Sequence, residues 1–401
     1  MPKASPESPI IVAGGGPVGM LSALLLARAG QPVILLESAE VIQEDMRAST
    51  FHSATLDILD EVGLADPLIA LGSTATRWQY MVHETGERAV FDLSILQDIT
   101  RHTYRLQCEQ FHLTRLIAAC AESEPLFDLR LGWAVTDVEP YESGVRVSVR
   151  HEGGEETLDT PWLIGADGAH SSVRNSLNLP FSGTVFPKTS ITMVIRYPLE
   201  QHVPELLGVN YVWTRDAHYS LMQIRDLWRF TYSPQIDASI EHELDESVAL
   251  AKLHSVFPDV GAVPILQLNH YTLHQRCLES FRLGRIMFAG DAAHLNSPAG
   301  GMGMNSGLHD AVSLVEHLLA VLAGGEESLL ERYDRRRRTI AQEEVQRLSS
   351  RNYQRHRETD EGKRETIWSE LKAITQDDQR MRDFLMRSSM IHSRAREREI
   401  Q

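Results

Sequence analysis

The hydrophobic positions of this chain begin with a strand–helix–strand pattern. Residues 9–13 form a short apolar run that is typical of a buried strand, and four residues follow it, three of them glycine. Apolar side chains then recur at helical spacing over 20–26, Gly30 can end that helix, and 33–36 form a second apolar run. The first forty residues therefore predict two buried strands joined by a helix.

Two later apolar runs also end where glycine and aspartate meet. Residues 162–165 lead into Asp167-Gly168, and residues 285–289 lead into Gly290-Asp291. A glycine-rich loop follows the second run, and apolar spacing over 308–322 predicts a long helix that two glycines close. Buried strands that alternate with helices are typical of an α/β fold with a Rossmann-type parallel sheet.

Alternating patterns dominate the middle of the chain. Residues 191–197, 211–214, 219–224 and 228–232 each predict a strand, and residues 77–96 predict further ones. We expect these segments to form an inserted antiparallel β-sheet that covers a substrate. The side chains expected to line its pocket are methionine and aromatic residues: Met193, Tyr211, Trp213, Tyr219, Met222 and Phe230.

The chain beyond Arg335 is rich in charged residues, with apolar side chains spaced as in amphipathic helices. Helices of this kind could cap the first domain or form the contact of a homodimer. The basic run 335–338 is interpreted as a solvated helix face, because the whole chain is acidic.

Composition excludes several classes of protein. The 401 residues suffice for two or three domains, and the net charge of −16 argues against binding to nucleic acid or to an anionic membrane. Three scattered cysteines provide neither a disulfide framework nor a four-ligand zinc site, so we expect a reducing, cytoplasmic setting and no metal. No apolar segment is long enough to cross a bilayer.

Gly14, Gly16 and Gly19 form a G-x-G-x-x-G motif between the first predicted strand and helix. The first glycine permits a tight turn, the second lets backbone approach a pyrophosphate, and the third lets helix and strand pack closely. Glu37 follows about twenty residues later, where a carboxylate can bind ribose hydroxyls and repel a 2′-phosphate. The motif predicts a dinucleotide site at the start of a helix.

The loop after Gly290-Asp291 predicts a second part of the ligand site. Pro298 and three glycines between residues 300 and 303 let backbone approach a flat ligand closely. The helix that opens near Asn305 presents unpaired N–H groups and the positive end of its dipole to an electron-rich acceptor. We therefore expect a cradle for a planar, partly anionic ligand.

The three motifs, in this order, resemble those of the single-component flavoprotein aromatic hydroxylases, the family that includes para-hydroxybenzoate hydroxylase. The resemblance spans about the first 340 residues. It implies an FAD-binding domain in three pieces, 1–76, 100–178 and 278–344, a substrate-binding sheet domain from 77–99 and 179–277, and C-terminal helices over 345–401. The cofactor-binding residues that it assigns are Gly14, Gly16, Pro17, Val18, Gly19, Glu37, Arg47, Gln110, Asp167, Asp291, Pro298, Gly301, Gly303, Met304 and Asn305.

The resemblance also implies a reaction. FAD would be reduced by NAD(P)H and react with O2, and the resulting flavin C4a-hydroperoxide would hydroxylate a small aromatic, phenolic or N-heteroaromatic. Arg47 and Asp167 would also serve the nicotinamide cofactor. Acidic residues after Glu37 favour NADH over NADPH, because they repel a 2′-phosphate. No counterpart of the Ser/Arg pair that holds the carboxylate of hydroxybenzoates is evident, so the acid group of the substrate stays open.

Acid–base residues are less clearly indicated. His52 and His218 are candidates to deprotonate a phenol, and Pro298 is included among the candidate catalytic residues because its loop borders the flavin ring. A non-oxygenating FAD reductase or dehydrogenase could use the same cofactor site. A nucleotide-binding module without catalysis is the further alternative, and a flavin-dependent halogenase is disfavoured because its Trp-x-Trp-x-Ile-Pro motif is missing.

Overall fold

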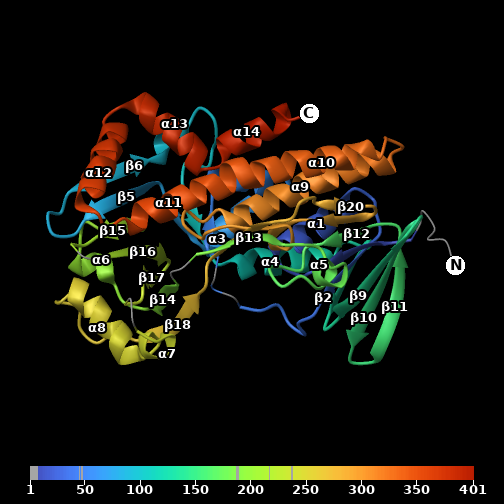
Figure 1. The fold of residues 1–401 in the computed structure, drawn as a ribbon, viewed down its shortest axis with the longest axis horizontal. Helices are drawn as coiled ribbons and strands as arrows, with labels where there is room; N and C mark the ends of the chain where they lie inside the picture. Colours follow the sequence, from blue (N-terminus) through green and yellow to red (C-terminus); the bar gives the residue numbers. More distant parts are fainter. Residues whose placement is uncertain (1–7, 45, 47, 187–188, 216, 236–237) are drawn as a thin grey trace.

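The computed structural model describes residues 8–44, 46, 48–186, 189–215, 217–235 and 238–401. A parallel sheet and its helices form one end of the molecule, and a seven-stranded sheet forms the other (Figure 1). Helices from the last quarter of the chain run across both. The predicted α/β fold with a second sheet and a helical C-terminal segment is confirmed.

The six-stranded sheet has the order β20-β21-β12-β1-β2-β8. All of its strands except β20 run parallel, so the carboxyl ends of β1, β12 and β21 lie at one edge of the sheet. The three glycine motifs follow at this edge. Helices α1 and α9 pack against one another beside this sheet. The bounds are β1 Ile10–Ala13, β2 Val33–Glu37, β8 Phe127–Leu131, β12 Leu163–Gly165, β20 Arg282–Leu283, β21 Ile286–Phe288, α1 Pro17–Arg28 and α9 Gly303–Leu322.

The seven-stranded sheet has the order β18-β14-β17-β16-β15-β5-β6 and is antiparallel except where β15 runs parallel to β5. Residues 77–92, far away in sequence, complete it as predicted. One face packs on α8 and on Leu199 through a core that contains Met193, Tyr219 and Phe230. The bounds are β5 Arg77–Val82, β6 Arg88–Asp92, β14 Ser190–Ile195, β15 Val209–Trp213, β16 His218–Ile224, β17 Leu227–Tyr232, β18 Ile265–Tyr271, α7 Ile240–Glu243 and α8 Glu246–Val256.

Three small sheets account for the remaining strands, and helices α2 to α6 lie in the connections between strands. The meander β11-β10-β9 extends from the parallel-sheet end of the molecule (Figure 1). The bounds are β3 Thr50–Phe51, β4 Ser73–Ala75, β7 Arg105–Gln107, β9 Ala134–Tyr141, β10 Gly144–His151, β11 Gly154–Thr160, β13 Ser182–Val185, β19 His274–Cys277, β22 His294–Leu295, α2 Ser53–Glu61, α3 Ala65–Leu71, α4 Gln110–Ala121, α5 Ser172–Ser176, α6 Leu199–His202, η1 Leu93–Leu96 and η2 Gly290–Ala292.

The C-terminal helices bridge the two large sheets. Helix α10 lies beside α9 and continues through one π-helical turn into α11, which reaches the seven-stranded sheet (Figure 1). Leu371 and Leu385 then bury their side chains against Trp78 and Phe91 of that sheet. None of the helices described is long and apolar enough to cross a membrane. The bounds are α10 Ser328–Ile340, η3 Ala341–Gln346, α11 Arg347–Arg357, α12 Glu361–Thr375, α13 Asp378–Ser388 and α14 Ile391–Glu399.

Candidate functional site

A cavity of about 870 Å³ joins the glycine motifs to the seven-stranded sheet. Its volume is near the upper end of the range for small-ligand sites. The cavity is lined by the carboxyl ends of the parallel strands, the loop 297–304, one face of the seven-stranded sheet, and helices α11 and α13. The cofactor motifs and the predicted substrate sheet therefore share one cavity.

The first glycine motif forms a tight turn between β1 and α1. Gly14 has φ of +108°, and a Cβ there would lie 2.4 Å from the carbonyl oxygen of Ala166. A Cβ at Gly19 would lie 2.0 Å from the carbonyl oxygen of Gly14, so Gly19 serves close packing and does not line the cavity. Pro17 and Val18 begin α1 and lie in the lining. The N-terminus of α1 thus opens onto the cavity.

The turn fixes the carboxylate of Glu37 at the end of β2. Its Oε2 accepts a hydrogen bond from the Gly15 N–H at 2.6 Å, and its Oε1 accepts one from the Ala39 N–H at 2.8 Å. The same side chain lines the cavity. Glu37 is thereby held as an oriented acceptor beside the turn that would carry a pyrophosphate.

Asp167, which follows β12, faces the same cavity. Its Oδ2 accepts a hydrogen bond from the Val173 N–H at 3.1 Å, whereas its buried Oδ1 has no partner among the described residues. Burial raises the pKa of Asp167, and the donors around it partly offset that rise. A buried acceptor without a partner indicates that a ligand donor completes the site.

The Gly290-Asp291 turn is held by a buried charge network that the sequence analysis did not find. Asp310 on α9 accepts hydrogen bonds from the Gly290 N–H at 3.0 Å, from His294 Nε2 at 2.7 Å and from Arg337 Nε at 2.6 Å. Burial alone would raise the pKa of Asp310, but His294 and Arg337 outweigh it and hold that pKa far below its usual range. The turn that presents Asp291 to the cavity is therefore braced by an ionised carboxylate.

The sequence signal for this network was weak because its members lie on three separate segments. Arg337 also donates to Glu397 at 2.7 Å, so the network ties α14 to the cofactor end of the molecule. Asp310 lies one helical turn after Ser306, whose carbonyl oxygen accepts from Arg337. The available clue was a charged residue among the buried positions of the predicted helix over 308–322.

Within the glycine-rich loop, Pro298, Gly301, Gly303 and Met304 line the cavity, but Asn305 does not. The fully buried Asn305 side chain accepts from the His52 N–H and donates to the carbonyl oxygens of Thr50 and Gly301. The structure therefore gives Asn305 the task of fixing the loop, in place of the direct contact with a ligand that was expected of it.

His52 also lies behind this loop and not in the cavity wall. Its Nε2 lies 2.7 Å from the carbonyl oxygen of Gly300, which it can contact only as a donor. Burial, followed by the charge of Arg105, lowers the pKa of His52 to about 3, so the ring is neutral near pH 7. This placement corrects the expectation that His52 meets a substrate: the residue positions the loop.

The cavity face of the seven-stranded sheet carries only part of the expected pocket. Tyr211 and Met222 line the cavity, and so does His218, whose Nε2 lies 3.2 Å from the hydroxyl of Ser233. Met193, Tyr219 and Phe230 point to the opposite face, because residues alternate between the two faces of a strand.

Trp213 is the fourth expected pocket residue that the structure places elsewhere. It is buried at the end of β15, where its indole N–H donates to the carbonyl oxygen of His356 at 2.9 Å. Its ring contacts Trp368 of α12. The sheet presents four small polar side chains to the cavity, Ser190, Thr192, Ser220 and Thr231, beside the larger aromatic ones of Trp78, Tyr80 and Tyr211. Two of the six expected pocket residues therefore face the cavity, and four do not.

Helices α11 and α13 supply cavity residues that the sequence analysis missed. Helix α11 contributes four side chains to the wall, and α13 contributes two: Asn352, Tyr353, His356, Arg357, Phe384 and Ser388. Their spacing of one helical turn on α11 was visible, but nothing in the sequence said what that face would meet.

Two expected cofactor residues remain to be placed. Gln110 opens α4 and lines the cavity, and its backbone N–H donates to the carbonyl oxygen of Ala48 at 2.9 Å. Arg47 lies outside the described residues. The segment that carries it adjoins Ser49 and Thr50, which both line the cavity.

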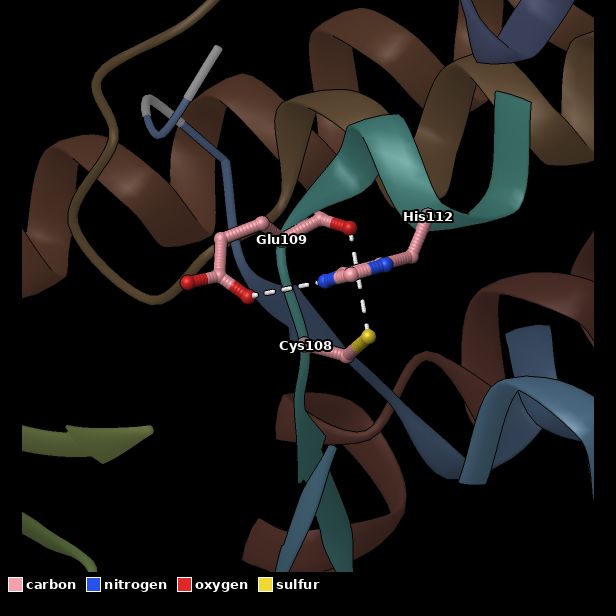
Figure 2. A group of neighbouring side chains, drawn as sticks. All are labelled: Cys108, Glu109 and His112. Carbon is pink, nitrogen blue, oxygen red and sulfur yellow. Dashed lines mark hydrogen bonds and ion pairs between the residues drawn. The ribbon is translucent and has the colours of Figure 1, made fainter. Parts of the chain in front are cut away.

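Cys108, Glu109 and His112 form a small cluster beside Gln110 (Figure 2). Their ligand atoms lie within 4.8 Å of one another, and the closest approach of His112 to the Glu109 carboxylate is 3.7 Å. Burial raises the pKa of the Cys108 thiol to about 12, and the charge of Arg225 opposes a cation near both Cys108 and His112. Because the charge of Arg225 opposes a bound cation, no metal role is assigned to the cluster.

The residues present fit FAD. The turn at Gly14 and Gly16 leaves open space toward the cavity, since a Cβ built at Gly16 meets nothing within 4 Å. Asp167 retains a buried acceptor, and the N-terminal ends of α1 and α9 have no acidic residue in their first turns. Two helix N-termini whose own first turns carry no acidic residue suit the negative charges of a flavin dinucleotide.

Comparisons with known proteins agree with this geometry. A family model described as an FAD binding domain matches residues 7–348. The chain is 31% identical over 385 residues to 6-hydroxy-3-succinoylpyridine 3-monooxygenase HspB of Pseudomonas putida, covering 94% of this chain and 96% of that protein. It is 30% identical over 392 residues to para-nitrophenol 4-monooxygenase of a Pseudomonas species, covering 96% of each.

A solved structure is similar over nearly the same length. The crystal structure of p-nitrophenol 4-monooxygenase PnpA from Pseudomonas putida matches with a TM-score of 0.89 and 28% identity. The match covers 94% of this chain and 96% of that one.

Proposed function

Because this chain belongs to the FAD-dependent aromatic monooxygenases, we propose that it uses NADH and O2 to hydroxylate a small phenolic or N-heteroaromatic compound. It is an FAD-dependent oxidoreductase of the monooxygenase type. The observation that carries the proposal is the single cavity in which the FAD motifs meet one face of the seven-stranded sheet. A substrate in that cavity would lie against the loop at Pro298 and be enclosed by α11.

FAD, when bound, supplies the oxygen-transfer chemistry, and the protein supplies position and exclusion of water. The turn at Gly14 and Gly16 would hold its diphosphate, Glu37 its ribose hydroxyls, and Asp291 its ribityl chain. The N-terminus of α9 would stabilise negative charge at the flavin ring. We propose the discontinuous FAD domain, the sheet domain and the C-terminal helices with the ranges given above.

His218 is proposed to mediate the proton of a substrate hydroxyl. It lines the cavity, and the hydroxyl of Ser233 lies 3.2 Å from its Nε2, which offers a route for a proton away from the substrate. His52 is given no part in this step, since it lies behind the loop and does not line the cavity.

The preference for NADH is supported by local charge. Glu40 is exposed after β2, whereas the charge of Glu44 is offset by Arg115 at 2.6 Å, so Glu40 is the acid that supports this preference. An adjacent 2′-phosphate would be repelled there. The expected result is a larger kcat/KM for NADH than for NADPH, and an equal or inverted ratio contradicts this preference.

Two further proposals concern the setting of the enzyme. A reducing, cytoplasmic environment is supported by the described cysteines, all of which are free thiols. A homodimer remains a proposal, tested by light scattering of the FAD-loaded protein.

The function is tested with FAD-loaded protein and a panel of phenols and hydroxypyridines. NADH oxidation should accelerate with at least one compound, and O2 should be consumed in equal amount to the hydroxylated product. An alternative, the non-oxygenating reductase or dehydrogenase, predicts substrate turnover that continues without O2. Such turnover would contradict the proposal.

A further inference from the structure

The substrate end of the cavity is cationic although the protein as a whole is strongly acidic. Among the described residues, the carboxylates that line the cavity are Glu37, Asp167 and Asp291, and all three belong to the FAD motifs. The sheet face and α11 contribute Arg229 and Arg357 and no carboxylate. A ligand that reaches beyond the flavin therefore meets positive charge.

Arg357 is the guanidinium whose surroundings point to an anionic ligand. It lies at the end of α11, and its Nη2 donates to Ser190 Oγ at 2.7 Å and to the carbonyl oxygen of Thr189 at 3.3 Å. Its buried Nη1 has no hydrogen-bond partner, and no carboxylate among the described residues forms an ion pair with it. A half-buried guanidinium with an N–H group that has no acceptor destabilises the folded protein unless an anion accepts a hydrogen bond from it.

The surroundings of Arg357 restrict what that anion can be attached to. The Tyr353 ring lies 4.6 Å beneath the guanidinium, and Tyr211 and His218 face His356 one residue away. These rings form an aromatic wall at the same end of the cavity. The anion would therefore be a substituent on a flat aromatic ring and not a free small ion.

The position of Arg357 on helix α11 determines how far it lies from the loop that carries Gly300. A Cβ at Gly300 would lie 2.8 Å from Asn352 Nδ2, so the helix touches the loop at Asn352. Arg357 follows five positions later, about 7.5 Å farther along the helix axis. That separation leaves room for an aromatic ring between the loop and the guanidinium.

Taken with the proposed function, on which it rests, this arrangement leads us to propose that Arg357 is a specificity residue which binds an anionic substituent, foremost a carboxylate, of the aromatic substrate. Ser190 positions the guanidinium. The C-terminal segment therefore selects the substrate class, and hydroxylated aromatic acids are bound in preference to their neutral analogues.

A binding experiment on FAD-loaded enzyme tests this inference separately from turnover. The probes are three matched pairs of acid and amide: 4-hydroxybenzoate, 4-hydroxyphenylacetate and 3-(4-hydroxyphenyl)propionate with their carboxamides. Perturbation of the flavin absorbance gives each dissociation constant. At least one acid should bind roughly 10- to 100-fold more tightly than its amide, which is the range of a charge-assisted hydrogen bond.

Variants identify the residue responsible. Arg357→Gln should remove the preference for the acid while leaving the affinity for the amide within about twofold, and Arg357→Lys should restore part of it. The matched control is Arg364→Gln, because Arg364 also ties the C-terminal helices to the sheet, through the carbonyl oxygens of Thr214 and Ala217, but does not line the cavity. This control should keep the wild-type ratio.

Equal binding of acids and amides by the wild type overturns the inference, and so does an equal loss of both in Arg357→Gln. Failure of all six probes to perturb the flavin also counts against it, because anionic aromatics of these lengths would then not be ligands. None of these results depends on oxygen transfer. Conversely, a wild type that prefers acids but does not hydroxylate contradicts the proposed function alone.

Discussion

Replacing Asp310 by asparagine tests whether the buried charge network supports the cofactor turn. In the native protein Oδ2 accepts from both Gly290 N–H and His294 Nε2, and Oδ1 accepts from Arg337 Nε. An asparagine has one acceptor oxygen, so in either orientation its NH2 group faces Gly290 N–H or Arg337 Nε, and two donors oppose one another. Arg337, which is fully buried, also loses one of its two carboxylates.

The expected cost follows from this geometry. Breaking a buried, hydrogen-bonded ion pair by removing one charge costs about 3–5 kcal/mol. For 401 residues unfolding as one unit, the unfolding entropy is about 0.8 kcal/mol/K, so Tm should fall by about 4–6 °C. FAD should also be bound more weakly, because the turn at Gly290 is the one that presents Asp291.

The assay is thermal unfolding at pH 7.5 with and without added FAD, together with the flavin-to-protein ratio after gel filtration. Asp66→Asn is the control, because the Asp66 side chain is 75% exposed where it meets Arg101, and its Tm should stay within about 1 °C of the wild type. An Asp310→Asn protein with wild-type Tm and flavin content would refute the reasoning.

Three other predictions concern the histidine behind the loop, the glycine turn and the two faces of the sheet. His52 is neutral in the folded protein, with a pKa of about 3, but takes up a proton near pH 6.5 in the unfolded chain, so its contribution to stability is complete above pH 6.5 and is lost as pH falls toward 3. In urea unfolding between pH 7.5 and 5, the wild type should lose about 2 kcal/mol more of its unfolding free energy than His52→Gln, and parallel losses contradict this. Gly14→Ala should be purified without flavin, because its Cβ would meet a carbonyl oxygen. Gly63→Ala, with φ of +74° and no atom within 4 Å of the added Cβ, should keep flavin absorbance, and equal flavin contents would contradict the role of the Gly14 turn in binding FAD. Met193→Ala should destabilise by about 2–5 kcal/mol without changing KM for the aromatic substrate, and Met222→Ala should change KM with a smaller loss of stability; the reverse pattern would mean that the cavity faces are misassigned.

The cofactor half of the fold was predictable because its signals are local. A strand of four residues, a turn that only glycine permits at φ of +108°, and a carboxylate after the next strand all lie within the first forty residues. Each of these residues is constrained by neighbours in sequence or by backbone geometry. The same holds for Gly290-Asp291, which ends a fully buried strand.

The strands of the substrate half could be predicted, but not which face of their sheet lines the cavity. The alternation in β14 separates Ser190 and Thr192 from Ile191 and Met193, yet it does not say which face a helix will cover. Helices α6 and α8 cover the face that carries Met193, so Ser190 and Thr192 line the cavity. Large apolar side chains alone therefore do not identify the face that lines the cavity.

Tertiary contacts account for the remaining misses. Arg357 meets Ser190 across 167 positions of sequence, and Arg337 meets Asp310 from a different helix. Neither pair has a local pattern. The C-terminal helices were predicted as helices, but their contribution to the cavity depends on where α11 crosses the sheet.

The origin of the oxygen atom in the product tests the central claim most directly. FAD-loaded enzyme, NADH and an aromatic substrate from the panel should be incubated under ¹⁸O-labelled O2 and, in parallel, in ¹⁸O-labelled water, with the product analysed by mass spectrometry. A monooxygenase transfers one atom from O2, so the product should carry one ¹⁸O from labelled gas and none from labelled water. A product without label from the gas would contradict the assignment of this cavity to oxygen transfer.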